Sequence, residues 1–371
     1  MGATAGAAGP PRAIPGLEGI AAAETALSHV EGDSGRLILC GYELAEFAER
    51  HDFETAAALF WGVAEDRPPS SAADVRAALG AARVAAFSRF ADLVPAFEGL
   101  TPSEGVRLGL ASLPGRESGA HVAAAGAVPV FLANVVRLAR GDRPIAPDPR
   151  AEHVADFFRM LRGAPADPKE VAALTTYLVT VMDHGMNAST FTARVIASTG
   201  AGLSWAALGA YAALTGPLHG GAPEPVLDML DAIGTPERAA AWIETTLRNG
   251  KRLMGFGHRI YRVRDPRADV LKGALEQLAP SGEKLELARA VETAALDALR
   301  RHKPGRRLET NVEFYTAMLL DGLGMPRSAF TPLFAMGRVV GWTAHALEQR
   351  RTGRLIRPES IYVGRRPVEV S

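Results

Sequence analysis

The chain has 371 residues, of which 47% are apolar and 22% are charged, as in a soluble globular protein with two domains or one large one. Its 41 basic residues balance 41 acidic residues, which excludes a nucleic-acid binder that relies on overall basicity. A single cysteine, Cys40, excludes an intramolecular disulfide and a cysteine-rich metal site, and it suits a reducing compartment.

The N-terminal residues 1–15 are rich in alanine, glycine and proline and carry one charge, Arg12. They lack the basic start and apolar run of a signal peptide, so we expect a flexible tail on a cytoplasmic protein. The longest weakly polar run, 119–136, is largely alanine and is interrupted by Pro129 and Asn134. It predicts a buried helix rather than a membrane span, which needs about 20 strongly apolar residues.

Residues 24–42 predict one β hairpin, because two short runs flank a turn-rich segment at 31–35. Helices dominate the rest of the chain. A strong start stands at Asp167, where aspartate caps, Pro168 fits the first position and Glu170 follows three residues after the cap. The other expected helices lie at 43–50, 53–61, 71–93, 235–249, 265 onward, 281–301, 311 onward and 331–353. No fixed-period repeat and no βαβ alternation appear, so the predicted fold class is mainly α.

Two histidines stand beside glycines: His219 in PLHGG and His258 in GFGHR. Glycine lets the backbone approach a ligand closely, so each imidazole can face a bound molecule. The nine positions after His258 hold four arginines, Arg259, Arg262, Arg264 and Arg267. Guanidinium groups suit carboxylate and phosphate. Imidazoles for proton handling beside arginines for anion binding indicate chemistry on an acidic metabolite.

Six segments in order carry a resemblance to citrate synthase and 2-methylcitrate synthase: DHGMNASTFTARV, GPLHGGA, GFGHRIYRVRDPRA, NVEFYTAMLL, GRVVGWTAHALEQ and LIRPESIYVG. The front of the chain, from residue 16 to 54, matches as well. The resemblance implies a mostly helical homodimer of the short bacterial and archaeal type. It also implies a small domain at 216–322 between two pieces of a large domain, 16–215 and 323–371.

The activity that the resemblance implies is addition of acetyl-CoA to oxaloacetate, followed by thioester hydrolysis to citrate and CoA. Glu313 matches the base that removes a methyl proton, His219 the donor to the thioester oxygen, and His258 the donor to the ketone oxygen. Most relatives carry aspartate where this chain has Glu313. The extra methylene moves the carboxylate by about 1.5 Å, and a misplacement near 1 Å costs roughly a hundredfold in rate. A relative adapted to glutamate is preferred, and a non-catalytic acyl-CoA-binding relative stays open.

The remaining site residues are assigned by the same resemblance. Oxaloacetate is expected to meet His184, Asn187, Arg267, Arg338 and Arg357. Arg357 would cross to the partner's site, so the active site needs the homodimer. The acyl-CoA is expected to meet Lys251, Arg252, Leu253, Met254 and Gly255, and its phosphates are expected near Lys251, Arg252, Arg262 and Arg264.

A metalloenzyme is the main rival, since histidines and a glutamate are candidate ligands. The spacings between His184, His219 and His258 are 35 and 39 residues, and no HExxH motif is present. We therefore expect no metal and no resident cofactor, and neither nucleic acid nor membrane as a partner. Acetyl-CoA is preferred over propionyl-CoA, but the choice stays open because one methylene is worth only about 1–3 kcal/mol in a pocket.

Overall fold

The structure, a computed structural model, describes residues 13–115, 118–220, 223–258, 260–279 and 282–365. Within these residues the chain is mostly helical with one small sheet, which confirms the predicted fold class. The helices of the first half are α1 (Leu44–Arg50), α2 (Phe53–Glu65), α3 (Ala72–Asp92), α4 (Val94–Phe97), α5 (Pro102–Ala111), α6 (Ala120–Ala139), α7 (His153–Arg162), α8 (Pro168–Thr180), α9 (Ala188–Ser198) and α10 (Leu203–Leu214).

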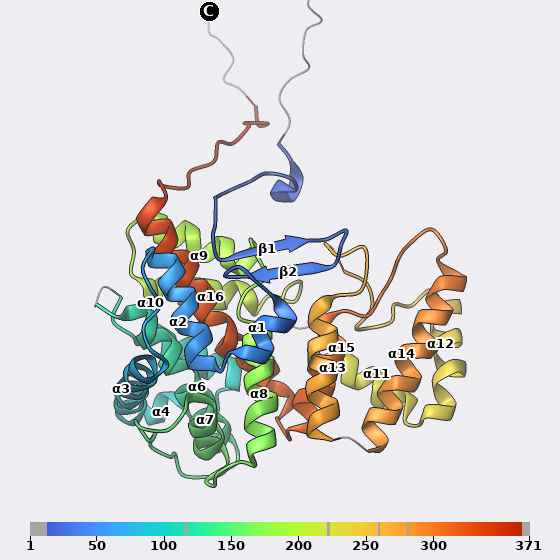
Figure 1. The fold of residues 1–371 in the computed structure, drawn as a ribbon, viewed down its shortest axis with the longest axis horizontal. Helices are drawn as coiled ribbons and strands as arrows, with labels where there is room; N and C mark the ends of the chain where they lie inside the picture. The colour runs from blue at the N-terminus through green and yellow to red at the C-terminus, as the bar shows by residue number, and fades with distance from the viewer. Residues whose placement is uncertain (1–12, 116–117, 221–222, 259, 280–281, 366–371) are drawn as a thin grey trace, which may run out of the picture.

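The helices of the second half are α11 (Pro223–Ile233), α12 (Ala239–Arg248), α13 (Pro266–Leu278), α14 (Glu283–His302), α15 (Val312–Gly322) and α16 (Phe330–Thr352). Helices α11 to α15 gather on one side of the molecule (Figure 1). They belong to the segment predicted as the small domain, and the domain division itself stays a prediction. Three short 3-10 helices occur at Pro15–Leu17, Pro236–Arg238 and Arg327–Ala329.

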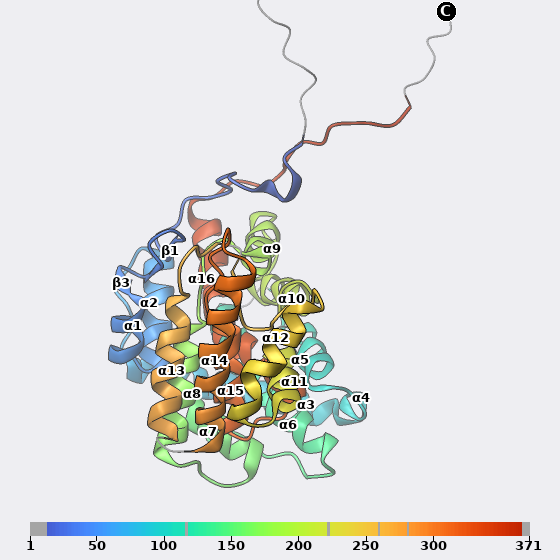
Figure 2. The ribbon, with the colours of Figure 1, turned by 90° about the vertical axis from the view of Figure 1, so that its right-hand side faces the viewer.

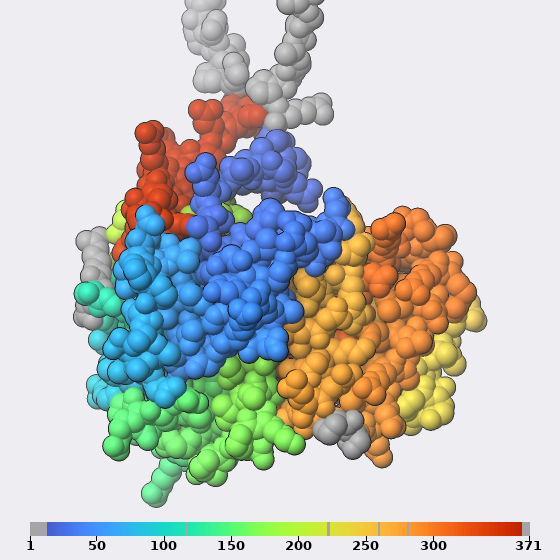
Figure 3. Space-filling view, in the orientation of Figure 1, coloured from blue at the N-terminus to red at the C-terminus, as the bar shows by residue number. Residues whose placement is uncertain are grey.

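The predicted hairpin is present and gains a third strand. Strands β1 (Ser28–Glu31), β2 (Arg36–Leu39) and β3 (Tyr42–Glu43) form an antiparallel sheet in that order. Leu37 and Leu39 are buried, as expected for alternate side chains that face the core. The N-terminal region lies against α13 (Figure 3), and α1 contacts that helix.

Local capping explains two helix starts that matter for the site. Asp167 and Glu170 form the predicted capping box at α8. Asn311 caps α15, because its Oδ1 accepts from the Glu313 backbone N–H at 3.0 Å. The last helix, α16, begins at Phe330 rather than at the predicted residue 331, because the preceding 3-10 turn runs directly into it.

Helix α16 runs through the core, where it packs against α2, α6, α9 and α10. Helix α6 is long and apolar enough to cross a membrane, but 72% of its most apolar window is buried inside the protein. That burial is typical of a core helix, as the sequence predicted. The two ends of the described chain, 13–24 and 353–365, leave the body on the same side (Figure 2). Most of the predicted flexible tail, 1–15, lies outside the described residues.

Candidate active site

Two of the predicted histidines, which are far apart in the sequence, lie close together in the structure. The rings of His184, just after α8, and His258, in the loop before α13, lie 5.6 Å apart between centroids. Tyr261 completes the cluster, since its hydroxyl lies 3.1 Å from His184 Nε2. Tyr261 was not among the predicted site residues, although it follows His258 by three positions in the matched GFGHRIYRVRDPRA segment. Burial lowers the pKa of His184 well below its ordinary value, so its imidazole is neutral.

His258 is held in one tautomer by its own loop. Its Nδ1 accepts hydrogen bonds from the backbone N–H groups of Ile260 and Tyr261, each at 3.0 Å. The ring proton therefore lies on Nε2. Burial, and then Arg267, lower the pKa of His258 to about 4. His258 is thus a neutral imidazole with one N–H donor on the side of Arg267, whose Nη2 lies 3.3 Å from His258 Nε2.

Asp265 joins the arginine to the candidate base. It caps α13 and pairs with Arg267, with Nη2 to Oδ2 at 2.7 Å, and both side chains are buried. The same Oδ2 accepts from the Val312 backbone N–H at 3.2 Å, which fixes the start of α15 beside the start of α13. The sequence analysis treated Asp265 only as a helix start, because its contact with α15 links positions 47 residues apart.

Glu313 lies in the first turn of α15, and no described side chain donates a hydrogen bond to its carboxylate. Burial raises its pKa to about 7; Arg267 lowers the pKa, Asp265 raises it, and Arg338 lowers it. A helix N-terminus by itself favours the ionised carboxylate, which would lower the pKa. Desolvation outweighs the helix dipole at this position.

Arg338 comes from α16 and is 1% exposed. Its Nε donates to the carbonyl of Val181 at 2.6 Å, and its guanidinium lies 4.7 Å from the centroid of the Phe334 ring. Its Nη2 is buried and has no partner among the described residues. Burial lowers the pKa of Arg338 to about 10, a value at which it is still a cation at neutral pH. A buried cation with an unused donor is suited to an anionic ligand.

His219 lies in the turn after α10 and reaches α9, with Nε2 2.8 Å from Ser189 Oγ. Ser189 Oγ also accepts from Trp342 Nε1 at 3.1 Å. Burial, and then Arg338, lower the pKa of His219 to about 4, so this imidazole is neutral too. The charge of Arg338 lowers the pKa of both His219 and Glu313, and the charge of Arg267 lowers the pKa of both Glu313 and His258. Among the described residues no direct contact joins Glu313 to either histidine, so their meeting around one substrate stays a prediction.

Asn187 has a local role in the structure. Its Oδ1 caps α9 by accepting from the backbone N–H groups of Ser189 and Thr190, and it lies 2.8 Å from the Ser189 hydroxyl oxygen. It therefore orders the residues that hold His219. Direct contact between Asn187 and a substrate stays a prediction.

The segment expected to bind acyl-CoA borders a pocket of about 520 Å³ that reaches His258. Arg252 and Leu253 line it, whereas Lys251, Met254 and Gly255 do not. Gly255 contributes through its backbone: its φ is +83°, and a Cβ there would meet the Phe314 side chain at 2.9 Å. The other lining residues are Leu247, Phe256, Gly257, Leu299, Lys303, Arg306 and Leu308.

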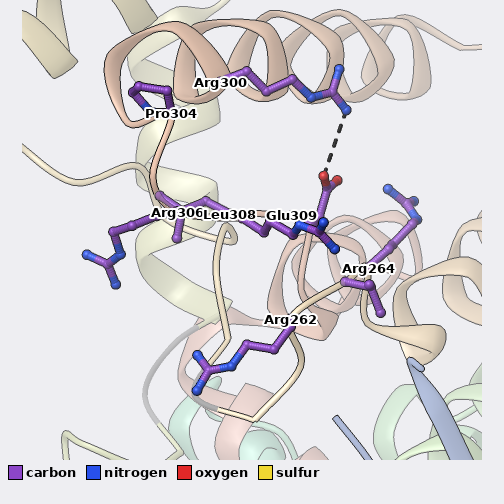
Figure 4. Close-up of a pocket in the computed structure, with 9 residues that line it drawn as sticks. Arg262, Arg264, Arg300, Pro304, Arg306, Leu308 and Glu309 are labelled. Atoms are coloured by element: carbon purple, nitrogen blue, oxygen red, sulfur yellow. Dashed lines mark ion pairs between the residues drawn. The ribbon is translucent and has the colours of Figure 1, made fainter. Parts of the chain in front are cut away.

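A second pocket, of about 440 Å³, lies on the other side of Arg306 and Leu308 and is lined mainly by arginines (Figure 4). Arg264 is tied to Asp269 and Glu292, and Arg300 lies 3.8 Å from Glu309. No carboxylate lies within ion-pair distance of three others among the described residues: Arg262, Arg306 and Arg307. These three exposed cations suit a phosphorylated ligand.

Some of the predicted site residues do not join the site in this structure or lie outside the described residues. Arg357 is exposed on the segment after α16, and among the described residues it makes no contact with the histidine cluster. Arg259 and Gly221, from the matched motifs, lie outside the described residues. Among the described residues, no three His, Cys, Asp or Glu side chains gather closely enough to hold a metal ion. The absence of a resident cofactor stays a prediction.

Comparison with known proteins gives a consistent result. The family described as "Citrate synthase, C-terminal domain" matches residues 16–359. The chain is 39% identical over 366 residues to "Putative citrate synthase 2" of Mycobacterium tuberculosis, covering 96% of this chain and 95% of that protein. It is 33% identical over 380 residues to the citrate synthase of Acidithiobacillus ferridurans, covering 95% and 96%.

Solved structures agree with the sequences. The crystal structure of citrate synthase from Thermotoga maritima aligns with a TM-score of 0.82 and 32% identity, covering 96% of this chain and 97% of that one. A citrate synthase from Thermoplasma acidophilum, solved as a ternary complex with carboxymethyl coenzyme A and oxaloacetate, aligns with the same TM-score and 27% identity, covering 96% and 98%.

Proposed function

The chain belongs to the citrate synthase family of condensing enzymes, and from this premise we propose that it joins acetyl-CoA, oxaloacetate and water to give citrate and CoA. The observation that carries the proposal is the buried group of His184, His258 and Arg267, which Asp265 links to the start of the helix that carries Glu313. The ternary complex of the Thermoplasma relative with oxaloacetate and a coenzyme A analogue supports the same pair of substrates.

Oxaloacetate carries two carboxylates and one ketone, and the site offers a partner for each. Arg267 and Arg338 are buried cations that suit the carboxylates, and His184 is a neutral neighbour. His258 Nε2–H is the donor for the ketone oxygen, since its Nδ1 is occupied by two backbone N–H groups. This donor stabilises the negative charge that develops on the oxygen when the ketone carbon is attacked.

Glu313 is the base in this proposal. A pKa near 7 matches a proton-transfer group to neutral pH, since a base with a pKa near the operating pH combines availability with driving force. The ionised carboxylate takes a proton from the thioester methyl group, and the resulting enol carbon forms the new bond to the ketone carbon. Water then adds to the thioester carbonyl, and the C–S bond breaks to release CoA.

His219 supplies the donor for the thioester oxygen once its tautomer is set. The Ser189 hydroxyl has one proton, and it lies within hydrogen-bond distance of both Asn187 Oδ1 and His219 Nε2. Asn187 Oδ1 already accepts from two backbone N–H groups, so Ser189 can donate to His219 Nε2 without leaving Asn187 Oδ1 unpaired. When Ser189 donates to His219 Nε2, the ring proton lies on Nδ1 and is free to meet the enolate oxygen.

The two pockets support coenzyme A as the carrier of the acyl group. The 520 Å³ pocket leads to His258, and the neighbouring arginine-lined pocket suits phosphates. A homodimer belongs to the proposal as well, with Arg357 reaching the diacid site of the partner. A cytoplasmic location also stays a prediction; sedimentation equilibrium and cell fractionation test these two points.

The deciding experiment measures CoA release from acetyl-CoA and oxaloacetate by the purified full chain. We expect turnover in the parent and a loss of about 10²–10⁴-fold in Glu313→Gln, the range for removal of a general base. Glu98→Gln is the matched control and should retain activity, because Glu98 is exposed after α4 and lines neither pocket. Binding of acetyl-CoA without any turnover would overturn the enzyme and support the non-catalytic acyl-CoA-binding alternative.

The same assay determines which acyl-CoA the protein prefers. Acetyl-CoA is the proposed substrate, and propionyl-CoA, which would make the protein a 2-methylcitrate synthase, is the alternative. A kcat/KM at least tenfold higher for acetyl-CoA supports citrate formation, whereas the reverse ratio assigns the 2-methyl product.

A further inference from the structure

Tyr177 is a buried tyrosine that neither the sequence analysis nor the proposed mechanism uses. It lies on the last turns of α8 and is 0% exposed. Its hydroxyl is buried and has no hydrogen-bond partner among the described residues. Burial, and then the charge of Glu313, raise the pKa of Tyr177 well above its ordinary value, while Arg338 lowers it. The phenol is therefore neutral at physiological pH and has one proton to donate.

The backbone fixes Tyr177 close to Arg338. Val181 lies one turn after Tyr177, and its N–H donates to the Tyr177 carbonyl at 3.0 Å. The Val181 carbonyl in turn accepts from Arg338 Nε at 2.6 Å. Helices α8 and α16 touch closely here, because a Cβ on Gly337 would lie 2.6 Å from the Leu178 carbonyl oxygen. Helix α15, which carries Glu313, packs against α8 as well.

The Tyr177 hydroxyl on α8 and Arg338 Nη2 on α16 are buried and have no hydrogen-bond partner among the described residues. Helix α8 packs against both α16 and α15, which carries Glu313, and the charge of Glu313 raises the pKa of both side chains. Buried polar groups are almost always hydrogen-bonded, so unpartnered ones on helices that pack around α15 are candidates for groups that act when the site is filled. Thr180 Oγ1 and Asp183 Oδ1, on and just after α8, are buried without a partner among the described residues as well. Arg338 has a partner in the proposed function, a carboxylate of the diacid. Tyr177 has none.

We propose that Tyr177 is a positioning residue for Glu313: its hydroxyl donates a hydrogen bond to the carboxylate, directly or through one water, when the substrates fill the site. This inference rests on the proposed function, because it concerns the base of that reaction. It also gives a reason for glutamate at this position. An aspartate carboxylate would stand back by about 1.5 Å, the length of one C–C bond, and would lose this partner.

The electrostatic surroundings of Glu313 define what the hydrogen bond would change. Arg267 and Asp265 face it from the start of α13, and Arg338 faces it from α16. None of these side chains donates a hydrogen bond to the carboxylate among the described residues. A donor from α8 would therefore be its one specific neutral partner, and it would favour the ionised form, which acts as the base.

Tyr177→Phe tests the proposal, because it removes one oxygen and keeps the ring. We expect kcat to fall about tenfold at pH 7 and the acid limb of its pH profile to move up by roughly one unit, since loss of a donor raises the pKa of the carboxyl group. The KM for oxaloacetate should stay within about twofold, because Tyr177 does not hold the diacid in this proposal.

Tyr211→Phe is the matched control. Tyr211 is another fully buried tyrosine, but its hydroxyl donates to the Ser103 carbonyl at 3.1 Å, between α10 and the start of α5. Its loss should lower the melting temperature and leave the pH profile unchanged. A second comparison uses Glu313→Asp, in whose background Tyr177→Phe should change kcat less than twofold.

The outcomes separate this inference from the proposed function. An acid limb that does not move in Tyr177→Phe overturns the positioning role, and so does a KM effect without a kcat effect, which would assign the hydroxyl to the diacid. A parent without turnover overturns the proposed function instead. In that case a ¹³C-NMR titration of labelled glutamate, with the Glu313 signal identified by its loss in Glu313→Gln, still tests whether Tyr177→Phe raises that pKa.

Discussion

Two buried arginines in this chain have the same chemistry and opposite surroundings. Arg83, on α3, is 0% exposed, and each of its three nitrogens has a partner. Its Nε donates to Asp156 Oδ2 at 2.8 Å, and its Nη1 lies 3.3 Å from His153 Nδ1. Its Nη2 donates to the carbonyls of Asp148 and Ala151. Arg338, on α16, is 1% exposed, and its Nη2 has no partner among the described residues. Burial lowers the pKa of both.

The difference between the two arginines shows how to separate structure from function in a core. A buried guanidinium whose donors are all used holds helices together, as Arg83 holds α3 to α7 and to the segment before it. A buried guanidinium with an open donor has lost its hydrogen bonds to water, and the protein does not replace all of them. Such a residue is retained for a ligand, and the open donor marks the side from which that ligand binds.

The largest expected effect is on stability at the saturated arginine. Arg83→Met leaves Asp156 and two carbonyls without their main partner, so we expect a loss of about 3–5 kcal/mol in the free energy of unfolding. Urea denaturation of the full chain measures it. Folded Arg83→Met should keep the parent KM for oxaloacetate, and a changed KM with unchanged stability would break the comparison.

The matched change at the open arginine should act on function. Arg338→Met removes a cation with one open donor, although its charge also acts on the buried Asp183 and its Nε donates to the Val181 carbonyl, so we expect a smaller loss of stability than in Arg83→Met. The value of kcat/KM should fall about 10²–10³-fold, the loss typical of one buried charge partner in an active site. Steady-state kinetics with oxaloacetate varied measures this. A variant that loses several kcal/mol of stability but keeps the parent KM for oxaloacetate would place Arg338 with the structural arginines.

The carboxylate beside Arg338 makes stability depend on pH. The pKa of Glu313 in the folded chain, about 7, lies above its ordinary 4.5, so the folded chain keeps a proton that the unfolded chain releases. Stability contributed by the protonated form is therefore present below about pH 4.5 and is lost as the pH rises toward 7. Glu313→Gln should exceed the parent in stability by about 2–3 kcal/mol at pH 8 and match it at pH 4.5. Urea unfolding at the two pH values measures both differences, with Glu98→Gln, at an exposed glutamate, as the control. An equal difference at both pH values would contradict the raised pKa.

The smallest expected effect concerns the contact between the hairpin turn and the loop that carries His258. The turn of the hairpin rests on the His258 loop: the Arg262 N–H donates to the Gly32 carbonyl at 2.9 Å, and a Cβ on Gly32 would lie 2.5 Å from the Ile260 carbonyl oxygen. Gly32→Ala should push this loop away and lower kcat/KM about tenfold, with a loss of roughly 1 kcal/mol in stability.

The control for the hairpin is Gly273→Ala on α13, where a Cβ meets nothing within 4 Å. That change should leave the kinetics unaltered and stabilise the chain by about 0.5–1 kcal/mol, as alanine replaces glycine within a helix. If both variants behave alike, packing of the hairpin turn does not position the His258 loop.

Much of the fold followed from local sequence. The capping residues at Asp167 and Asn311 fixed the starts of α8 and α15, and the turn-rich segment at 31–35 fixed the hairpin, because caps and turns depend on neighbours only a few positions away. The order of the matched motifs identified the family and named the candidate residues. The third strand at Tyr42–Glu43 was not predicted, since two residues give no recognisable pattern.

The sequence by itself determined which side chains are available for the chemistry: the glycine-flanked histidines, the glutamate in the first turn of a helix and the arginines of the motifs. Only the tertiary structure decided which of them are open. Tyr177 and Arg338 are 161 residues apart in the sequence, and Arg338 Nε bonds to the carbonyl of Val181, at the end of the helix that carries Tyr177. The nitrogens of Arg83 are hydrogen-bonded by groups from residues 148–156. Whether a buried donor keeps a free hydrogen bond depends on what packs across from it, and local pattern carries no record of that distant partner.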